Sequence, residues 1–257
     1  MSGTVVIIPA RWASTRFPGK PLALIAGKPL VQHVWERCCE AKQITRVIVA
    51  TDDIRIAETV FNFGAEVSIT SSRHPTGTDR LAEVAERLRG FSRILNVQGD
   101  EPAIAPDLID RLAAEMAAHP RLEMVTAAAP FSSQEAVADP NNVKVVADLD
   151  GNALYFSRSG IPFNRDGGKG VLPMHHLGIY GYRRNFLLQF VRWKPTPLEK
   201  MEKLEQLRAL EHGAKIRVIT TKRRSVGVDV PQDIPVAEAE LRALLRRARR
   251  GSKSPAG

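Results

Sequence analysis

The chain has 257 residues, of which 44% are hydrophobic, and a formal net charge of +9, a size that suits one domain or one domain with a sizeable excursion. No apolar run approaches the ~20 residues of a membrane-spanning helix, and the N-terminus lacks the basic and then long apolar stretch of a secretion signal. The only cysteines, Cys38 and Cys39, are adjacent on a predicted helix, where their side chains diverge, so the sequence predicts a cytoplasmic protein without membrane insertion or structural disulfides.

The first half of the chain alternates predicted strands with predicted helices, the pattern of a doubly wound α/β sheet. Apolar, β-branched runs predict strands over residues 4–8, 46–50, 66–70, 93–97 and 123–128. Helical spacing of apolar residues and helix-starting residues predict helices over residues 29–41, 51–63, 79–89 and 106–118.

The middle of the chain breaks this alternation. Residues 143–147 and 153–156 predict a β-hairpin, and residues 177–182 a further strand. We expect an antiparallel excursion from the main sheet over about residues 131–185. A helix over residues 200–212, a strand over 216–220 and a helix over 231–247 complete a single predicted domain, residues 1–247.

The positive charge is concentrated at the C-terminus. Six basic residues and no acidic one lie from Arg242 to the end, so they account for six of the nine net positive charges. Residues 248–257 predict a disordered basic tail without a catalytic role. This tail supports one alternative interpretation of the chain, a basic nucleic-acid-binding protein. The ordered acidic and polar motifs described below argue against that interpretation.

The loop after the first strand is the most informative segment. It carries Arg11, Ser14, Arg16 and Lys20, and the carboxyl ends of strands are where open α/β sheets bind ligands. Cations, hydroxyls and backbone N–H groups in such a loop can hold a triphosphate, with Arg11 and Lys20 the best candidates for its β- and γ-phosphates. Pro21 after Lys20 excludes a Walker P-loop. The alternative is a solvated basic loop.

Two carboxylates are candidates for a magnesium site. Asp100 follows a predicted strand and Gly99, with Glu101 a competitor for the same role. Asp229 lies two residues before a helix-starting proline, so an N-terminal helix cap is its alternative role.

Six motifs in order resemble the family of CMP-Kdo synthetases (3-deoxy-manno-octulosonate cytidylyltransferases), in the sugar nucleotidyltransferase superfamily. They lie at residues 8–21, 97–102, 153–158, 176–182, 204–208 and 227–229, and the resemblance covers roughly residues 3–245. It implies a Rossmann-like doubly wound mixed sheet and a magnesium-dependent reaction, CTP + Kdo to CMP-Kdo + pyrophosphate, for lipopolysaccharide biosynthesis. It also implies a homodimer, with the middle segment covering the sugar site and supplying the dimer contact.

The resemblance assigns nucleotide and metal roles. It makes Asp100 and Asp229 the Mg²⁺ ligands, and Thr76, Gly77 and Gln98 the candidates for reading the cytosine edge. Arg80 is a candidate for the phosphate chain or the sugar carboxylate. From sequence alone, residues 75–80 serve equally well as a helix-capping segment.

Sugar recognition is expected from the middle segment and the helix that follows it. Arg158 and Arg165 are candidate partners of the sugar carboxylate, because the arginine fork suits that group. The resemblance places His176, Tyr180, Glu205 and Gln206 in the sugar pocket, and gives His175 no role. The alternatives are that Tyr180 lies in the core and that Glu205 and Gln206 lie on a solvated helix face.

Other chemistries are disfavoured. The chain has no Gly-x-Ser-x-Gly elbow and no histidines at metal-ligand spacing, which argues against covalent catalysis and a zinc site. An amino-substituted Kdo or another nonulosonic acid is the alternative acceptor, because a few pocket residues decide that choice.

Overall fold

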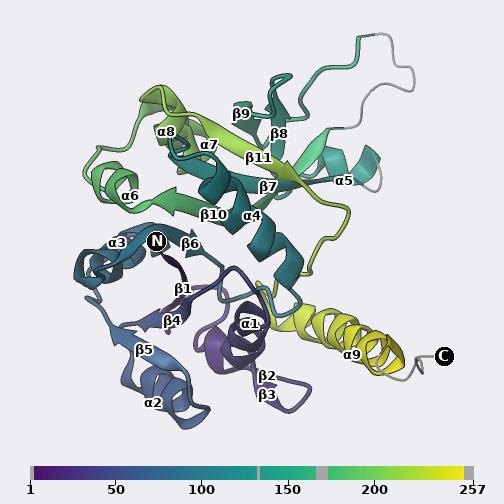
Figure 1. Cartoon of the computed structure of the whole chain (residues 1–257). Coiled ribbons are helices and arrows are strands. Elements are labelled where there is room, and N and C mark those ends of the chain that lie inside the picture. Colours follow the sequence, from purple (N-terminus) through teal and green to yellow (C-terminus); the bar gives the residue numbers. More distant parts are fainter. Residues whose placement is uncertain (1–2, 132–133, 166–172, 252–257) are drawn as a thin grey trace, which may run out of the picture.

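The computed structural model describes residues 3–131, 134–165 and 173–251 (Figure 1). Within these residues, nine strands form one sheet in the order β11-β7-β10-β6-β1-β4-β5, with β8 paired to β10 and β9 to β8. The strands are β1 Gly3–Ala10, β4 Arg46–Thr51, β5 Glu66–Ile69, β6 Phe91–Asn96, β7 Met124–Pro130, β8 Lys144–Ala147, β9 Ala153–Ser157, β10 Met174–Arg183 and β11 Ile216–Thr220. A separate small hairpin consists of β2 Leu24–Ile25 and β3 Lys28–Pro29.

Helices cover both faces of the sheet (Figure 1). They are α1 Leu30–Cys39, α2 Ile54–Asn62, α3 Gly77–Arg87, α4 Pro106–Ala118, α5 Gln134–Ala138, α6 Arg184–Phe190, α7 Pro197–Glu202, α8 Gln206–Glu211 and α9 Ile234–Gly251, with 3₁₀ turns η1 Lys20–Leu22 and η2 Pro231–Asp233. No helix in the described ranges is long and apolar enough to cross a membrane. Cys38 and Cys39 are both free.

Strand β1 explains why the sheet is covered on both faces. Val5 and Ile7 point into one apolar cluster, with α3, and Val6 and Ile8 into the other, with α1, α2 and α4. Successive side chains of a strand alternate between faces, so a continuous apolar run needs a cover on each side. The predicted doubly wound mixed sheet is therefore confirmed.

Strand β10 corrects part of the sequence-based picture. It lies within the main sheet, antiparallel to both β6 and β7, instead of in an excursion. A Cβ at Gly181 would lie 2.6 Å from a Val125 side-chain carbon and 2.7 Å from the Met116 sulfur, so only glycine permits the close packing of β7 and α4 against this strand. The β8–β9 hairpin alone projects from the sheet (Figure 1).

Two helix boundaries also differ from the predictions. The helix expected over residues 200–212 is broken between α7 and α8, because Lys203 ends α7 with a left-handed φ of 54°. Helix α9 continues to Gly251, four residues beyond its predicted end and into the segment expected to be disordered. The rest of that tail, residues 252–257, lies outside the described residues.

Candidate active site

A polar cleft lies at the carboxyl ends of β1 and β6. Its cavity has a volume of about 440 Å³. It is lined by Pro9, Ala10, Arg11, Ala13, Ser14, Thr15, Arg16, Lys20, Pro21, Gly77, Gln98, Gly99 and Asp100. The loop after β1, the loop after β6 and the first turn of α3 thus meet at one place, as predicted for strand ends of an open sheet.

The cationic loop after β1 is folded around Trp12. The Trp12 carbonyl accepts hydrogen bonds of 3.0 Å from both the Ser14 and the Gly19 N–H groups. Gly19 has a left-handed φ of 70°, and a Cβ there would lie 3.0 Å from the indole ring. The Arg55 guanidinium lies 3.3 Å from the centre of that ring. The loop is therefore curved by tight local contacts, and its cations face the cleft.

Lys20 brings the two predicted metal carboxylates together. Its Nζ lies 2.7 Å from Asp100 Oδ2 and 3.5 Å from Asp229 Oδ1, and Arg16 lies 3.1 Å from the same Asp229 oxygen. The two aspartates are 129 positions apart in the sequence, and a backbone bond of 2.9 Å from the Val228 N–H to the Asp100 carbonyl joins their segments.

The donor set fits a magnesium ion. Carboxylate oxygens are the ligands that Mg²⁺ prefers, and it commonly takes one or two from protein, with phosphate oxygens and waters completing six. Asp100 and Asp229 converge on one ammonium group, so a cation at this point would find both within reach. In the described ranges, no group of three His, Cys, Asp or Glu side chains is clustered for a metal, so the rest of such a shell would come from substrate and water.

Gly99 lets the loop after β6 approach β1. A Cβ at this position would lie 2.9 Å from the Pro9 carbonyl oxygen, a distance that real Cβ atoms do not tolerate. Gln98 beside it donates a 3.3 Å hydrogen bond to the Gly178 carbonyl of β10. The side-chain amide is therefore held at the boundary between the cleft and β10.

The first turn of α3 carries a capping box, as the local alternative predicted. The Thr76 side chain accepts from the Asp79 N–H, and the Asp79 carboxylate accepts from the Thr76 N–H. Gly77 lines the cavity, and the hydroxyl of the neighbouring Thr76 lies 3.1 Å from Glu205 Oε1. Capping and substrate contact are compatible here.

Of the predicted sugar residues, Glu205 contacts that same turn directly. Thr78 donates to Glu205 Oε2, and burial raises the pKa of the Glu205 carboxyl. Tyr180 lies against His176, with ring centres 5.4 Å apart. Gln206 is buried, and its side-chain nitrogen has no hydrogen-bond partner among the described residues. Polar groups without protein partners are expected where a ligand supplies them.

His176 is a neutral histidine. Its Nε2 lies 3.0 Å from the Thr126 hydroxyl, which donates its own hydrogen to the Ile179 carbonyl at 2.8 Å. With that hydrogen used, the hydroxyl oxygen can accept from Nε2–H, an arrangement that favours the tautomer protonated at Nε2. Burial lowers the pKa of His176 to about 3, with a smaller effect from His175.

The structure does not bring three predicted arginines into the cleft. Arg80 is fully buried behind α3, where its guanidinium lies 3.2 Å from Asp52 and donates to Thr70. Arg158 is held by the Glu202 and Pro140 carbonyls, at 2.8 and 3.0 Å. Arg165 is exposed, at the edge of residues 166–172, which lie outside the described residues.

Sequence reasoning missed two contributors. Thr78 contacts Glu205 directly, and its position two residues after Thr76 was the available signal. Ser225 donates a 2.6 Å hydrogen bond to Glu101, the residue considered only as a rival to Asp100. Burial of the Glu101 carboxyl raises its pKa to about 7, although the Ser225 bond opposes this shift.

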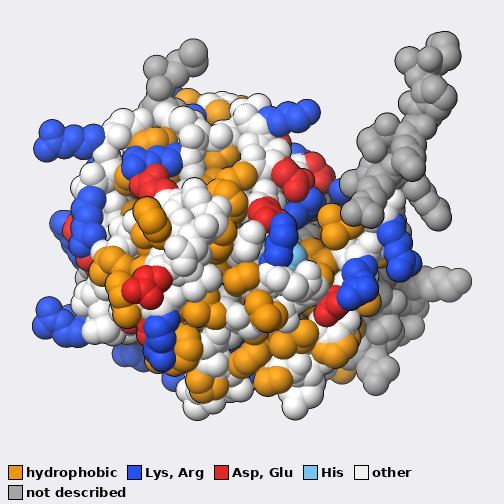
Figure 2. Space-filling view, turned by 90° about the horizontal axis from the view of Figure 1, so that it is seen from below, with side chains coloured by type: hydrophobic (Ala, Val, Ile, Leu, Met, Phe, Trp, Pro, Cys, Tyr) orange, Lys and Arg blue, Asp and Glu red, His pale blue; other side chains and the backbone are white. Residues whose placement is uncertain are grey.

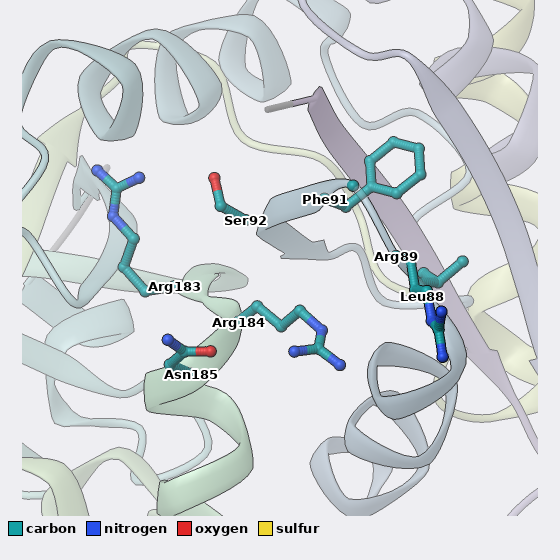
Figure 3. A pocket seen from close by; sticks show the side chains of 8 residues that line it. Leu88, Arg89, Phe91, Ser92, Arg183, Arg184 and Asn185 are labelled. Atoms are coloured by element: carbon teal, nitrogen blue, oxygen red, sulfur yellow. The ribbon is translucent and has the colours of Figure 1, made fainter. Parts of the chain in front are cut away.

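Another cavity, of about 400 Å³, lies at the amino end of β6, beside Phe91 and Ser92, at the opposite end of that strand from the polar cleft. Figure 3 shows Arg183 and Arg184 extending in different directions from one segment at its wall. Both guanidiniums donate to main-chain carbonyls, Arg183 to Leu122 and Arg184 to Ala85. These arginines cap the ends of neighbouring helices, so this cavity is a poor candidate for binding anions.

Comparison with known proteins identifies the family. A family model described as Cytidylyltransferase matches residues 5–216. The 3-deoxy-manno-octulosonate cytidylyltransferase of Geobacter sulfurreducens is 54% identical over 239 residues, covering 89% of this chain and 95% of the relative. That of Myxococcus xanthus is 50% identical, covering 93% and 97%. The chain belongs to the 3-deoxy-manno-octulosonate cytidylyltransferase family.

Solved structures agree with this membership. A CMP:2-keto-3-deoxy-manno-octonic acid synthetase complexed with CTP is 40% identical, with a TM-score of 0.90 over 94% of this chain and 99% of that one. A 4-diphosphocytidyl-2C-methyl-D-erythritol synthase from Anaerococcus prevotii shares the fold at 14% identity and a TM-score of 0.62. The resemblance that the sequence motifs carry to 3-deoxy-manno-octulosonate cytidylyltransferases is thus confirmed.

Proposed function

We propose that this protein transfers the cytidylyl group of CTP to Kdo, giving CMP-Kdo and pyrophosphate for lipopolysaccharide assembly. The observation that carries the proposal is the meeting of Lys20 with Asp100 and Asp229, at 2.7 and 3.5 Å, beside the cationic loop. Both substrates are anions, so neutralising charge at the reacting phosphate is the main catalytic task. The family relatives bear the name of this reaction.

The cationic loop is assigned to the triphosphate. Arg11, Ser14, Arg16 and Lys20 all line the cleft, and their cations and donors are held in place before substrate arrives. The α-phosphorus would be attacked by the anomeric 2-hydroxyl of Kdo while the bond to the β-phosphate oxygen breaks and pyrophosphate leaves. Preorganised charges of this kind are typically worth ~10²–10³ in rate each.

Asp100 and Asp229 would hold Mg²⁺. When bound, the ion would neutralise the triphosphate and acidify the attacking hydroxyl. Lys20 keeps both carboxylates turned toward the cleft and compensates their charge. Asp100→Asn and Asp229→Asn should each abolish turnover with the fold intact, and a near-normal rate in either variant would refute that ligand.

The sugar is assigned to the polar group beside α3. Glu205, Gln206, Tyr180 and His176 lie together there, and the neutral His176 offers hydrogen bonds without adding charge. Gly77 and Gln98 line the cleft with the cationic loop, and Thr76 contacts Glu205, so we assign the cytosine to these three residues. Of the arginine candidates for the Kdo carboxylate, we retain Arg165, because the donors of Arg158 are used by main-chain carbonyls.

We further propose a cytoplasmic homodimer, with the contact formed by the middle segment. A nucleic-acid-binding role is the weaker proposal. On the face seen from below, basic and acidic side chains lie next to one another (Figure 2), instead of forming the one-sign stripe of a nucleic-acid footprint. Deleting residues 248–257 should leave turnover unchanged and remove any polyanion binding.

The test is pyrophosphate release from the purified protein with CTP and Mg²⁺, comparing Kdo, 8-amino-Kdo, N-acetylneuraminate and no acceptor. Release with Kdo is expected. Release with one of the other acids alone would keep the chemistry and change the acceptor. No release with any acceptor, from folded protein, would refute the proposed activity.

A further inference from the structure

The segment of residues 225–229, whose Asp229 carboxylate pairs with Arg16 and Lys20, has one local backbone attachment, from the Asp229 N–H to Asp233 Oδ2 at 2.7 Å. Three further attachments lead to more distant parts of the chain. The Ser225 hydroxyl donates to Glu101 at 2.6 Å, and the Val226 N–H donates to Glu240 Oε2 at 2.9 Å. The Val228 N–H donates to the Asp100 carbonyl, also at 2.9 Å. Two of these attachments lead to the loop after β6, and the one through Glu240 leads to helix α9.

Helix α9 is itself fixed to the base of the site. Val228 is fully buried in an apolar cluster with Ala237 and Leu241 of α9 and with Leu30 of α1. Phe17 of the cationic loop packs against the same cluster. The helix therefore contacts both segments that supply the charged groups of the cleft, although none of the described residues that line the cleft belongs to it.

Within this arrangement the Glu240 bond has a distinct effect. Apolar contacts at Val228 fix the depth of the segment but are non-directional, whereas a carboxylate accepting one N–H group fixes its orientation. The bond lies three residues before Asp229 and acts on the first half of the segment, whereas Asp233 accepts the N–H of Asp229 itself. Without it, the segment keeps its anchor at Val228 and loses the hold on its first half from the side of α9.

We propose that Glu240 is a positioning residue for the metal site: from α9 it orients the 225–229 segment so that Asp229 faces Asp100. The proposal rests on the proposed function for its catalytic consequence. Its structural part, the hold of Glu240 on the segment, stands independently of that function.

The first experiment measures amide hydrogen exchange over residues 224–230 in the metal-free, substrate-free protein. A hydrogen bond to a charged acceptor typically changes a local opening equilibrium by about tenfold or more. Glu240→Ala should therefore speed exchange of this segment about tenfold, with Glu240→Gln, which keeps an acceptor oxygen, close to wild type. Glu238→Ala is the matched control: Glu238 pairs with Arg242 and accepts a hydrogen bond from the Ala26 backbone, and neither of these described contacts leads to residues 225–229.

The second experiment measures pyrophosphate release against Mg²⁺ concentration. Glu240→Ala should raise the Mg²⁺ concentration for half-maximal rate about tenfold and leave the KM for CTP near wild type, because the cationic loop is untouched. Ser225→Ala, which removes the bond to Glu101 without altering α9, should shift both readouts in the same direction. If the wild-type protein shows no turnover, the proposed function is refuted. The exchange experiment still tests whether Glu240 holds residues 225–229.

Unchanged exchange in Glu240→Ala would overturn the proposal, whatever the result for Ser225→Ala. So would faster exchange accompanied by an unaltered Mg²⁺ requirement, since the segment would then be held without consequence for Asp229. A uniform loss of thermal stability with equal changes in the KM for CTP and the Mg²⁺ requirement would also overturn it, because that is the behaviour of a merely structural residue.

Discussion

His176 makes the stability of this protein sensitive to acid in a predictable way. Its side chain is buried, at 8% exposure, between Thr126, Phe156 and Tyr180, and its pKa is lowered to about 3. In the unfolded chain a histidine titrates near pH 6.5. Between these two values the unfolded chain binds a proton that the folded protein does not, so stability falls as the pH is lowered from about 6.5 toward 3.

The size of the effect follows from the two pKa values. At pH 5 the unfolded state gains about 2 kcal/mol from protonating this histidine, while the folded state gains almost nothing. The loss at pH 7.5 is close to zero by the same relation. His175 contributes with the same sign, because burial and the nearby Arg224 lower its pKa to about 4.

The assay is urea unfolding at pH 7.5, 6.5, 5.5 and 5.0 for the wild type and for His176→Gln. The variant should be less stable than wild type at pH 7.5 and should lose about 2 kcal/mol less on going to pH 5. Carboxylate titrations affect both proteins equally and cancel in the difference. Parallel pH dependences for the two proteins would refute the claim that His176 stays neutral in the folded state.

Two further substitutions test the packing behind the site. Gly99→Ala should lower the free energy of unfolding by about 1–3 kcal/mol and weaken CTP binding, because its Cβ would meet the Pro9 carbonyl at 2.9 Å. Gly160→Ala, whose Cβ would make only ordinary contacts, is the control, and equal unfolding midpoints for the two variants would contradict the argument. Lys144→Met should lower the free energy of unfolding in urea by about 3–5 kcal/mol, because the buried ammonium donates to the Asp139, Asn142 and Arg158 carbonyls. A loss below about 1 kcal/mol would show that those carbonyls find other donors.

Local patterns in the sequence predicted most elements of the fold. Helix α4 has the predicted bounds, because Pro106 favours a helix start and the apolar spacing ends at Ala118. The break at Lys203 had no such signal, since lysine rarely adopts a positive φ and neither glycine nor proline marks the site. The place of β10 between β6 and β7 depends on pairing with distant strands, which its own residues do not specify.

The same distinction applies to the site. The positions of Lys20 and Asp100 at the cleft were predictable because each lies in a loop after a strand, at the edge where ligands bind. The metal roles of Asp100 and Asp229 rest on the family resemblance and stay predictions. The surroundings of Arg80 and Arg158 were not predictable. An arginine on a loop or in a first helical turn has the same local sequence whether it faces substrate or a buried carbonyl. Their partners, Asp52 and the Glu202 carbonyl, come from other elements.

The chain order explains why the C-terminal segment is needed at the cleft. Strand β11 lies at one end of the sheet, separated from β1 by β7, β10 and β6, so the chain must return past these strand ends to bring Asp229 to Lys20. That return is made by residues 221–229, most of them outside regular structure, which would be free to move without attachments. The bonds from Ser225, Val226 and Val228 and the packing of α9 supply those attachments. The cleft is thus assembled from both ends of the chain, and the segment that carries Asp229 is held from α9 through Glu240 and the packing of Val228.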